Sequence, residues 1–174
     1  PVANVLHDFH GGLEHIQKKI IISIGNPMLR FEEDPVRSLR AIRFSSKLNF
    51  KISGDIKEAI YQKATLLRNI SNARLFDEFC KIFLSKEAFN NFRKLQSFNT
   101  LKYLINTPNY DDDSFGLRFQ HAALINTDNR LKDEKSITPG FLLAALMWPR
   151  LVDSTKEEGV LNLKKFFRSM DSII

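Results

Sequence analysis

A carboxylate and four cations are spaced so that a single helix would carry them on one side. At 100° per residue, the four cations fall within an arc of about 120°: Arg37, Arg40, Arg43 and Lys47. Asp34 precedes Arg37 by one helical turn, so its carboxylate and the Arg37 guanidinium project together. The segment therefore presents one hydrogen-bond acceptor beside a row of donors.

Such a pair can distinguish nucleobases by their hydrogen-bonding edges. A carboxylate accepts hydrogen bonds, whereas a guanidinium only donates them. Adenine and cytosine both offer an amino donor beside a ring-nitrogen acceptor, and guanine and uracil present the reverse. A fixed Asp34–Arg37 pair would therefore admit A and C, because G or U would leave buried polar groups unpaired.

A purely structural role for the same residues remains open. Asp34 precedes Pro35, and an Asp at the N-cap with a Pro at the first helical position is a typical helix start. Arg37 would then pair with Asp34 at i+3, and the cations would form a solvated helix face.

Helices must position these residues. A β-branched run at 19–24, closed by Gly25, predicts one short strand whose sheet partners lie upstream. From Pro27 onward the patterns predict helices. Four helices are expected at residues 35–47, 53–67, 86–98 and 115–126. A further helix, the third along the chain, should begin at residue 71 or 72. Another should begin at residue 139 and stop or kink at Trp148-Pro149, and a last one should begin at about residue 160. The third should bury Leu75, Phe76, Phe79, Ile82 and Phe83.

The stretch GNPMLRFEEDPVRSLRAIRF, residues 25–44, resembles the neck signature of class II tRNA nucleotidyltransferases and bacterial poly(A) polymerases. In that family an EDxxR element acts as a protein template for the incoming base. The resemblance implies four nucleotide-binding residues: Glu33, Asp34, Arg37 and Arg40. Arg43 and Lys47, further along the same basic face, are expected to contact RNA weakly.

Further segments carry the resemblance. DFHGGLEH, residues 8–15, is similar to the DxxGGxxD element at the end of the catalytic head. Asp8, Gly11 and Gly12 match that element and are expected to form a head–neck hinge, whereas His15 replaces its last Asp. ISNARLFDEF, residues 70–79, and the stretch 126–148 are similar to bacterial poly(A) polymerases.

The resemblance implies a mainly α protein, the multi-helical neck and body of a class II nucleotidyltransferase. A short strand would remain from an α/β head. We expect residues 1–26 to be the C-terminal remnant of that head and residues 27–98 to be the helical neck that binds nucleobase and RNA. Residues 99–174 would be a truncated helical body.

The activity that the resemblance implies is that of a template-independent RNA 3′-adenylyltransferase. The parent enzyme would transfer AMP from ATP to RNA 3′ ends and release pyrophosphate. In the family a Gly-Ser loop and paired aspartates of the head hold Mg²⁺, which activates the attacking hydroxyl. The sequence contains no Gly-Ser followed by Asp-x-Asp. We therefore expect no catalytic residue and no metal site in this chain, and Mg²⁺ to be bound by a head outside it.

Two alternatives stay open. A CCA-adding tRNA nucleotidyltransferase is the closest alternative, because the Asp34–Arg37 pair would admit both A and C and cannot separate the two activities. A non-catalytic helical RNA-binding module is the alternative of another class.

Other clusters favour structure over chemistry. His7, His10 and His15 lack a cysteine or second acidic group to complete a metal site, and residues 111–113 read as a solvated aspartate loop. Arg74 and Glu78 are four residues apart and predict a pair on one helix face, whereas the family resemblance implies a brace of the neck. Residues 164–168, Lys-Lys-Phe-Phe-Arg, fit an amphipathic helix as well as an RNA contact.

Composition adds few constraints. The 174 residues carry 26 basic and 20 acidic side chains, a net charge of +6 that suits a polyanionic partner or ordinary solubility. Cys80 is the only cysteine, which excludes an internal disulfide and favours a reducing compartment, and we expect the bacterial cytoplasm. The longest apolar run, residues 141–148, is too short to span a bilayer.

Overall fold

The computed structural model describes residues 7–105, 110–111 and 114–158, with side chains as far as residue 153. Within them the chain is mainly helical after Pro27, as predicted. The elements are α1 (Gly12–Gln17), β1 (Ile20–Ile21), α2 (Pro27–Glu33), α3 (Val36–Lys47), β2 (Lys51–Ile52), α4 (Gly54–Lys63), η1 (Ala64–Asn69), α5 (Asn72–Phe83), α6 (Ala88–Ser97), η2 (Leu101–Tyr103), α7 (Phe115–Lys132) and α8 (Pro139–Glu158). The helix predicted from residue 160, the basic stretch 164–168, Asp112 and Asp113 lie outside the described residues.

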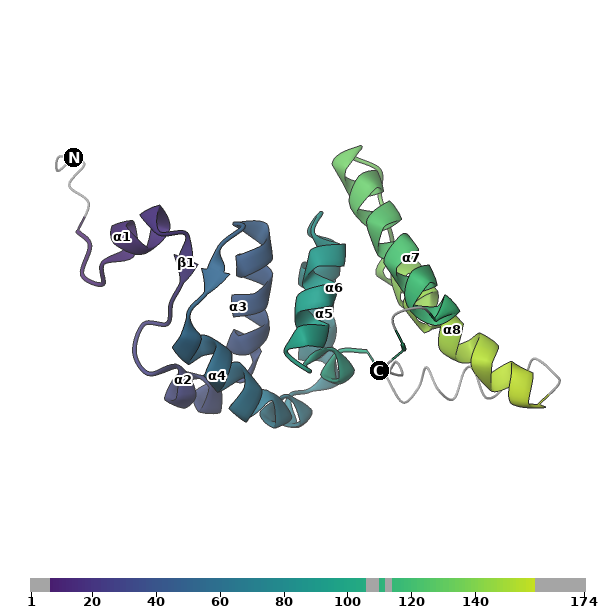
Figure 1. Cartoon of the computed structure of the whole chain (residues 1–174), viewed down its shortest axis with the longest axis horizontal. Coiled ribbons are helices and arrows are strands. Elements are labelled where there is room, and N and C mark those ends of the chain that lie inside the picture. Colours follow the sequence, from purple (N-terminus) through teal and green to yellow (C-terminus); the bar gives the residue numbers. More distant parts are fainter. Residues whose placement is uncertain (1–6, 106–109, 112–113, 159–174) are drawn as a thin grey trace.

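The helices follow one another across the molecule in chain order (Figure 1). α1 and β1 lie at one end, α2 to α4 form the next group, α5 and α6 stand beside them, and the α7–α8 hairpin closes the other end. α3 lies centrally, because it contacts α2, α4, α5, α6 and both strands. The candidate base-reading residues are therefore displayed from the most heavily packed helix of this region.

One partner of the predicted strand lies downstream in the chain. β1 pairs in parallel with β2, and the Lys51 amide donates to Lys19 O over 2.8 Å. The expectation of an upstream partner is wrong for this edge, because the break between α3 and α4 is extended at residues 51–52 rather than a simple turn. Asn49 has a φ of +52°, which turns the chain out of α3 and back along β1.

The start of α3 follows the predicted capping chemistry. Asp34 is extended, with φ −148° and ψ 93°, as expected for a residue that precedes proline. This residue separates α2 from α3, and its Oδ1 accepts from the Val36 amide at 3.3 Å. The helix is assigned from Val36, one residue later than predicted, a difference within the usual uncertainty of helix ends.

The predicted apolar face of α5 needs one correction. Phe79, Ile82 and Phe83 are buried as expected, but Phe76 is 47% exposed and stacks on Phe79. Glu78 occupies the interior instead. The buried face of α5 therefore includes one carboxylate, which contacts Arg40 and Lys81.

The last two helices are longer than predicted. α7 extends to Lys132, and its Asp128 accepts from the Ala88 and Phe89 amides at 2.7 and 3.1 Å. This carboxylate supplies the start of α6 with a cap from a distant helix. α8 does not stop at Pro149. The Leu146 carbonyl, one turn before that proline, accepts from Gln120 Nε2 of α7 at 2.7 Å, which supports the backbone where proline disturbs the helix.

No helix in the described part of the chain is both long and apolar enough to cross a membrane.

Candidate functional site

A cavity of about 400 Å³ lies between the β1 segment, α2 and α3. Its size falls within the range of pockets that hold small ligands. Three arginines line it together with apolar side chains. The lining residues are Ile21, Ile22, Ser23, Ile24, Arg30, Phe31, Arg37, Arg40, Ala41, Phe44 and Ile56. The cavity thus combines apolar surface with guanidinium donors and could accept a planar ring that carries polar edges.

Asp34 and Arg37 lie close together at the start of α3, as the spacing predicted. Arg37 Nε is 3.9 Å from Asp34 Oδ2. The shorter contact of Asp34 is to a residue of α5, since Arg74 Nη2 lies 2.8 Å from Oδ1. Oδ1 therefore serves both Arg74 and the helix cap, and Oδ2 keeps acceptor capacity for a further donor.

Arg40 also connects α3 with α5. Its Nε and Nη2 each lie 3.4 Å from Oε1 of Glu78, whose side chain is 2% exposed. Lys81 Nζ contacts the same oxygen at 3.3 Å and also pairs with Asp77. The predicted Arg74–Glu78 pair is wrong, because each residue reaches across to α3 instead. These ion pairs connect the start of α3 and α3 itself with α5.

Glu33 and Asp34 are not among the residues that line the cavity, and Glu33 reaches it only through the lining residue Arg30. The Glu33 carboxylate is 3.0 Å from Arg30 Nη1, and the Glu33 side chain is 56% exposed. Arg30 in turn donates from Nε to Ile24 O at 3.3 Å, so it ties α2 to the segment that follows β1. Sequence reasoning missed Arg30. Its position four residues before Asp34 was the only available signal.

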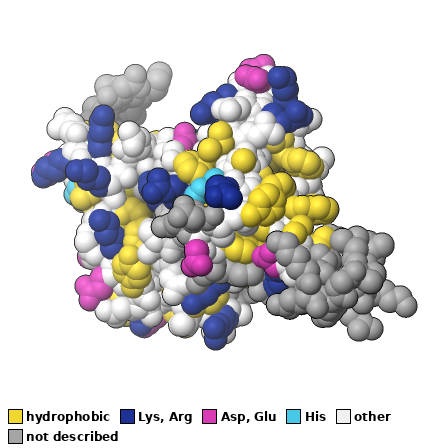
Figure 2. Space-filling model, turned by 45° about the vertical axis from the view of Figure 1, so that its right-hand side comes forward, with side chains coloured by type: hydrophobic (Ala, Val, Ile, Leu, Met, Phe, Trp, Pro, Cys, Tyr) yellow, Lys and Arg dark blue, Asp and Glu magenta, His cyan; other side chains and the backbone are white. Residues whose placement is uncertain are grey.

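The two residues expected to contact RNA differ in their surroundings. Lys47 is exposed at the end of α3. Arg43 is half-buried, with its guanidinium 4.4 Å from the Phe44 ring centre, and its buried Nε has no hydrogen-bond partner among the described groups. In the view of Figure 2, Lys and Arg side chains are scattered, and hydrophobic side chains gather over the side of α7 and α8.

The predicted hinge residues organise the start of α1. Asp8 accepts from the amides of His10, Gly12 and Leu13 at 3.3, 2.7 and 2.9 Å. The Leu13 and Gly12 amides lower the pKa of the Asp8 carboxyl, because they stabilise its charged form. Gly11 has a φ of +66°, in the left-handed region that favours glycine.

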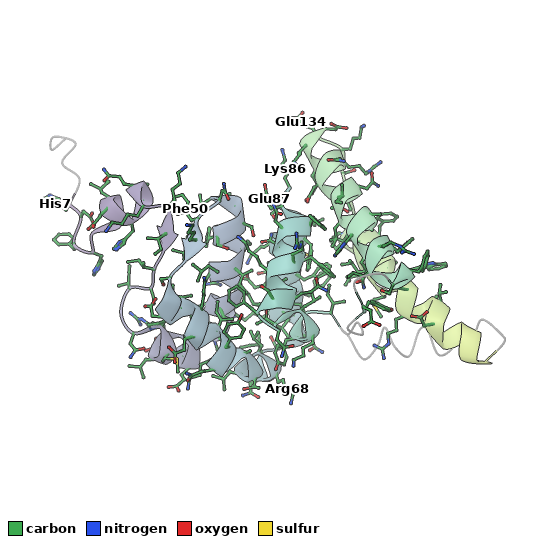
Figure 3. All side chains as sticks on the ribbon, in the orientation of Figure 1. His7, Phe50, Arg68, Lys86, Glu87 and Glu134 are labelled. Carbon is green, nitrogen blue, oxygen red and sulfur yellow. The ribbon has the colours of Figure 1, made fainter. Side chains whose placement is uncertain are left out.

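Metal ligation finds no support among the described side chains. No three His, Cys, Asp or Glu residues gather there in a way that could hold an ion. His7 lies near the N-terminal end and stacks on Phe9 (Figure 3). The labelled Lys86, Glu87 and Glu134 lie at turns between helices, away from the cavity that Arg37 and Arg40 line.

Comparisons with known proteins agree with the fold and place the chain in a family. Residues 49–113 match a family model described as "Probable RNA and SrmB- binding site of polymerase A". Poly(A) polymerase I of Salmonella typhi is 36% identical over 97% of this chain, which spans 38% of that relative. A CCA-adding enzyme of Bacillus licheniformis is 43% identical over 48% of this chain and 21% of its own length. A crystal structure titled as a tRNA nucleotidyltransferase with a primer tRNA and an incoming ATP analog has a TM-score of 0.66, 26% identity, and coverage of 80% of this chain and 41% of its own.

Proposed function

The chain belongs to the family of bacterial poly(A) polymerases and class II tRNA nucleotidyltransferases, and from that premise we propose that it is the part of a template-independent RNA 3′-adenylyltransferase that selects the nucleotide. The whole enzyme would transfer AMP from ATP to an RNA 3′ end and release pyrophosphate. The chain itself would recognise the base and contact RNA. Adenylation is favoured because the Salmonella typhi poly(A) polymerase is 36% identical over 97% of the chain, against 32% over 95% for the CCA-adding enzyme of Bacillus subtilis.

One observation carries the proposal. Asp34 and Arg37 offer an acceptor and a donor within 3.9 Å of each other, and Arg37 lines a cavity of about 400 Å³. Such a pair matches the amino and ring-nitrogen edge of adenine. Arg40 lies one turn further along the same cavity and would add a second donor. Glu33 would act indirectly, through its pair with Arg30 at the cavity wall.

RNA would bind along the basic end of α3. Arg43 and Lys47 are the residues we assign to weak contacts with phosphate, since Lys47 is exposed, Arg43 is half-buried beside the Phe44 ring, and neither forms an ion pair within the described residues. Asp8, Gly11 and Gly12 would form the junction with a head outside the chain. Mg²⁺ would be held in that head, as the family resemblance implies. A bacterial cytoplasmic location is part of the same proposal.

The test is nucleotide incorporation by the full-length protein that contains this chain. ATP and CTP are offered separately, each with a generic RNA and with a tRNA that lacks its 3′ CCA. The proposal expects repeated AMP addition to the generic RNA. CCA addition, the second candidate that the Bacillus licheniformis relative supports, would instead give CMP addition limited to the tRNA. Absence of any incorporation would favour a non-catalytic RNA-binding module.

A further inference from the structure

Glu78 carries a buried negative charge whose partners are imperfectly placed. Arg40 and Lys81 both contact its Oε1, at 3.4 and 3.3 Å. Hydrogen bonds between such charged groups are ordinarily shorter, about 2.7–2.9 Å. No described group lies within hydrogen-bond distance of Oε2, although the side chain is only 2% exposed. The contact between Glu78 and Arg40 is therefore long, and the Arg40 guanidinium can leave it.

Arg40 faces two partners. Besides Glu78, it lines the cavity with Arg37, and its side chain is 42% exposed. A nucleotide that drew the Arg40 guanidinium toward itself would take one cation away from Glu78. A buried carboxylate that loses its cation is strongly unfavourable, so Glu78 alone would oppose this movement.

Lys81 is placed to remove that opposition. It follows Glu78 by three residues on α5, and its ammonium also pairs with Asp77. Asp77 and Glu78 lie on the same helix as Lys81, so both contacts of the ammonium can persist when Arg40 moves. We propose that Lys81 is a positioning residue that neutralises Glu78 while Arg40 turns to the nucleotide. This role rests on the proposed function, because it requires Arg40 to bind the nucleotide.

Steady-state kinetics of the full-length protein with ATP and an RNA primer test this role. Lys81→Met should raise the KM for ATP about tenfold, with a smaller change in kcat, because Glu78 then retains Arg40. Glu78→Gln removes the charge that needs a counter-ion, so Glu78→Gln with Lys81→Met should have the same KM as Glu78→Gln alone. Lys81→Arg keeps the charge and should keep the wild-type KM. Lys135→Met removes a comparable exposed pair with Asp133 and serves as the matched control.

An unchanged KM for ATP in Lys81→Met would overturn the proposal. An increase that persists in the Glu78→Gln background would also overturn it, since Lys81 would then act on the nucleotide or RNA directly. If Lys81→Met melts below the assay temperature, Asp77→Asn is used to release Lys81, and it must raise the KM for ATP in a way that Glu78→Gln suppresses. Arg40→Ala distinguishes failure of the Lys81 role from failure of the proposed function. An unchanged KM for ATP in Arg40→Ala would show that Arg40 does not bind the nucleotide.

Discussion

Arg74 of α5 and Asp34 at the start of α3 are joined by a contact of 2.8 Å between Nη2 and Oδ1. This contact fixes the carboxylate that we assign to base recognition. Arg74→Met should therefore raise the KM for ATP in the full-length protein. Its effect on the free energy of unfolding should be small, about 1 kcal/mol, because the Arg74 side chain is 44% exposed and its charge is screened.

Arg93→Met is the control for that change. Arg93 is exposed on α6, and no ion pair or hydrogen bond of its side chain is observed in the described structure. Urea denaturation and the KM for ATP are measured for both variants. An ATP KM in Arg74→Met that equals the Arg93→Met value would show that Asp34 does not need Arg74.

The Asp128 carboxylate caps α6 from α7, and its loss should destabilise the fold. Asp128→Ala leaves the Ala88 and Phe89 amides without their acceptor. We expect a decrease of about 2 kcal/mol in the free energy of unfolding. Asp128→Asn keeps one side-chain oxygen as an acceptor and should lose less. Equal stability of the Ala variant and the wild type in urea denaturation would refute the capping role.

The same carboxyl gives a prediction about pH. Burial raises the pKa of Asp128 more than the amides of Phe89 and Ala88 lower it. The folded state therefore holds the proton more firmly than the unfolded state does. The contribution of Asp128 to stability is full below its unfolded pKa and decreases as pH rises through the folded pKa. The wild type should therefore lose stability relative to Asp128→Asn as pH rises above about 3.8, the ordinary pKa of an Asp carboxyl. A stability difference that grows with pH would contradict this assignment.

Two glycines, one in the first turn of α7 and one in the first turn of α8, should respond in opposite directions to alanine. A Cβ at Gly116 would lie 2.7 Å from Cε1 of Tyr110, so Gly116→Ala should cost about 1–3 kcal/mol by overpacking. A Cβ at Gly140 meets nothing within 4 Å in the described structure, and Gly140→Ala in the first turn of α8 should stabilise by about 0.5–1 kcal/mol. Thermal unfolding monitored by circular dichroism compares the two. A melting temperature for Gly116→Ala at or above the wild-type value would show that Tyr110 moves aside freely.

The Cys80 thiol should react slowly in the folded protein. Burial raises its pKa, and the charge of Asp77 adds to this effect. A smaller fraction is therefore thiolate, the reactive form, at a given pH near 8. The alkylation rate with iodoacetamide is measured against pH, with the protein unfolded in urea as the reference. Equal rates in the folded and unfolded protein would contradict the prediction.

Patterns within a few residues predicted the helical fold and the start of α3. Asp34 before Pro35 marked the start of α3, and the helical spacing placed Arg37 on the turn next to Asp34. These features depend on neighbours within four residues, so they can be read along the chain. The predicted mainly helical fold rests on the same kind of information and is confirmed.

Contacts between distant segments could not be predicted in this way. The Arg74–Asp34 contact joins residues 40 apart, and Arg40–Glu78 joins residues 38 apart. The sequence of α5 alone favours a pair between Arg74 and Glu78 on one helix, because it carries no information that α3 packs against α5. The β1–β2 pairing was missed for the same reason, since Lys51-Ile52 is too short to stand out as a strand.

Nucleotide selectivity of Arg37→Ala in the full-length protein tests the central claim most directly. The kcat/KM for ATP, CTP, GTP and UTP is measured with one RNA primer, and the RNA dissociation constant is measured in parallel, with Arg93→Ala as the control. The preference for ATP over GTP and UTP should fall by about tenfold or more, because one of the groups that rejects the wrong base is removed, and RNA affinity should change much less. Wild-type selectivity in Arg37→Ala would contradict the assignment of Asp34 and Arg37 as the base-reading pair.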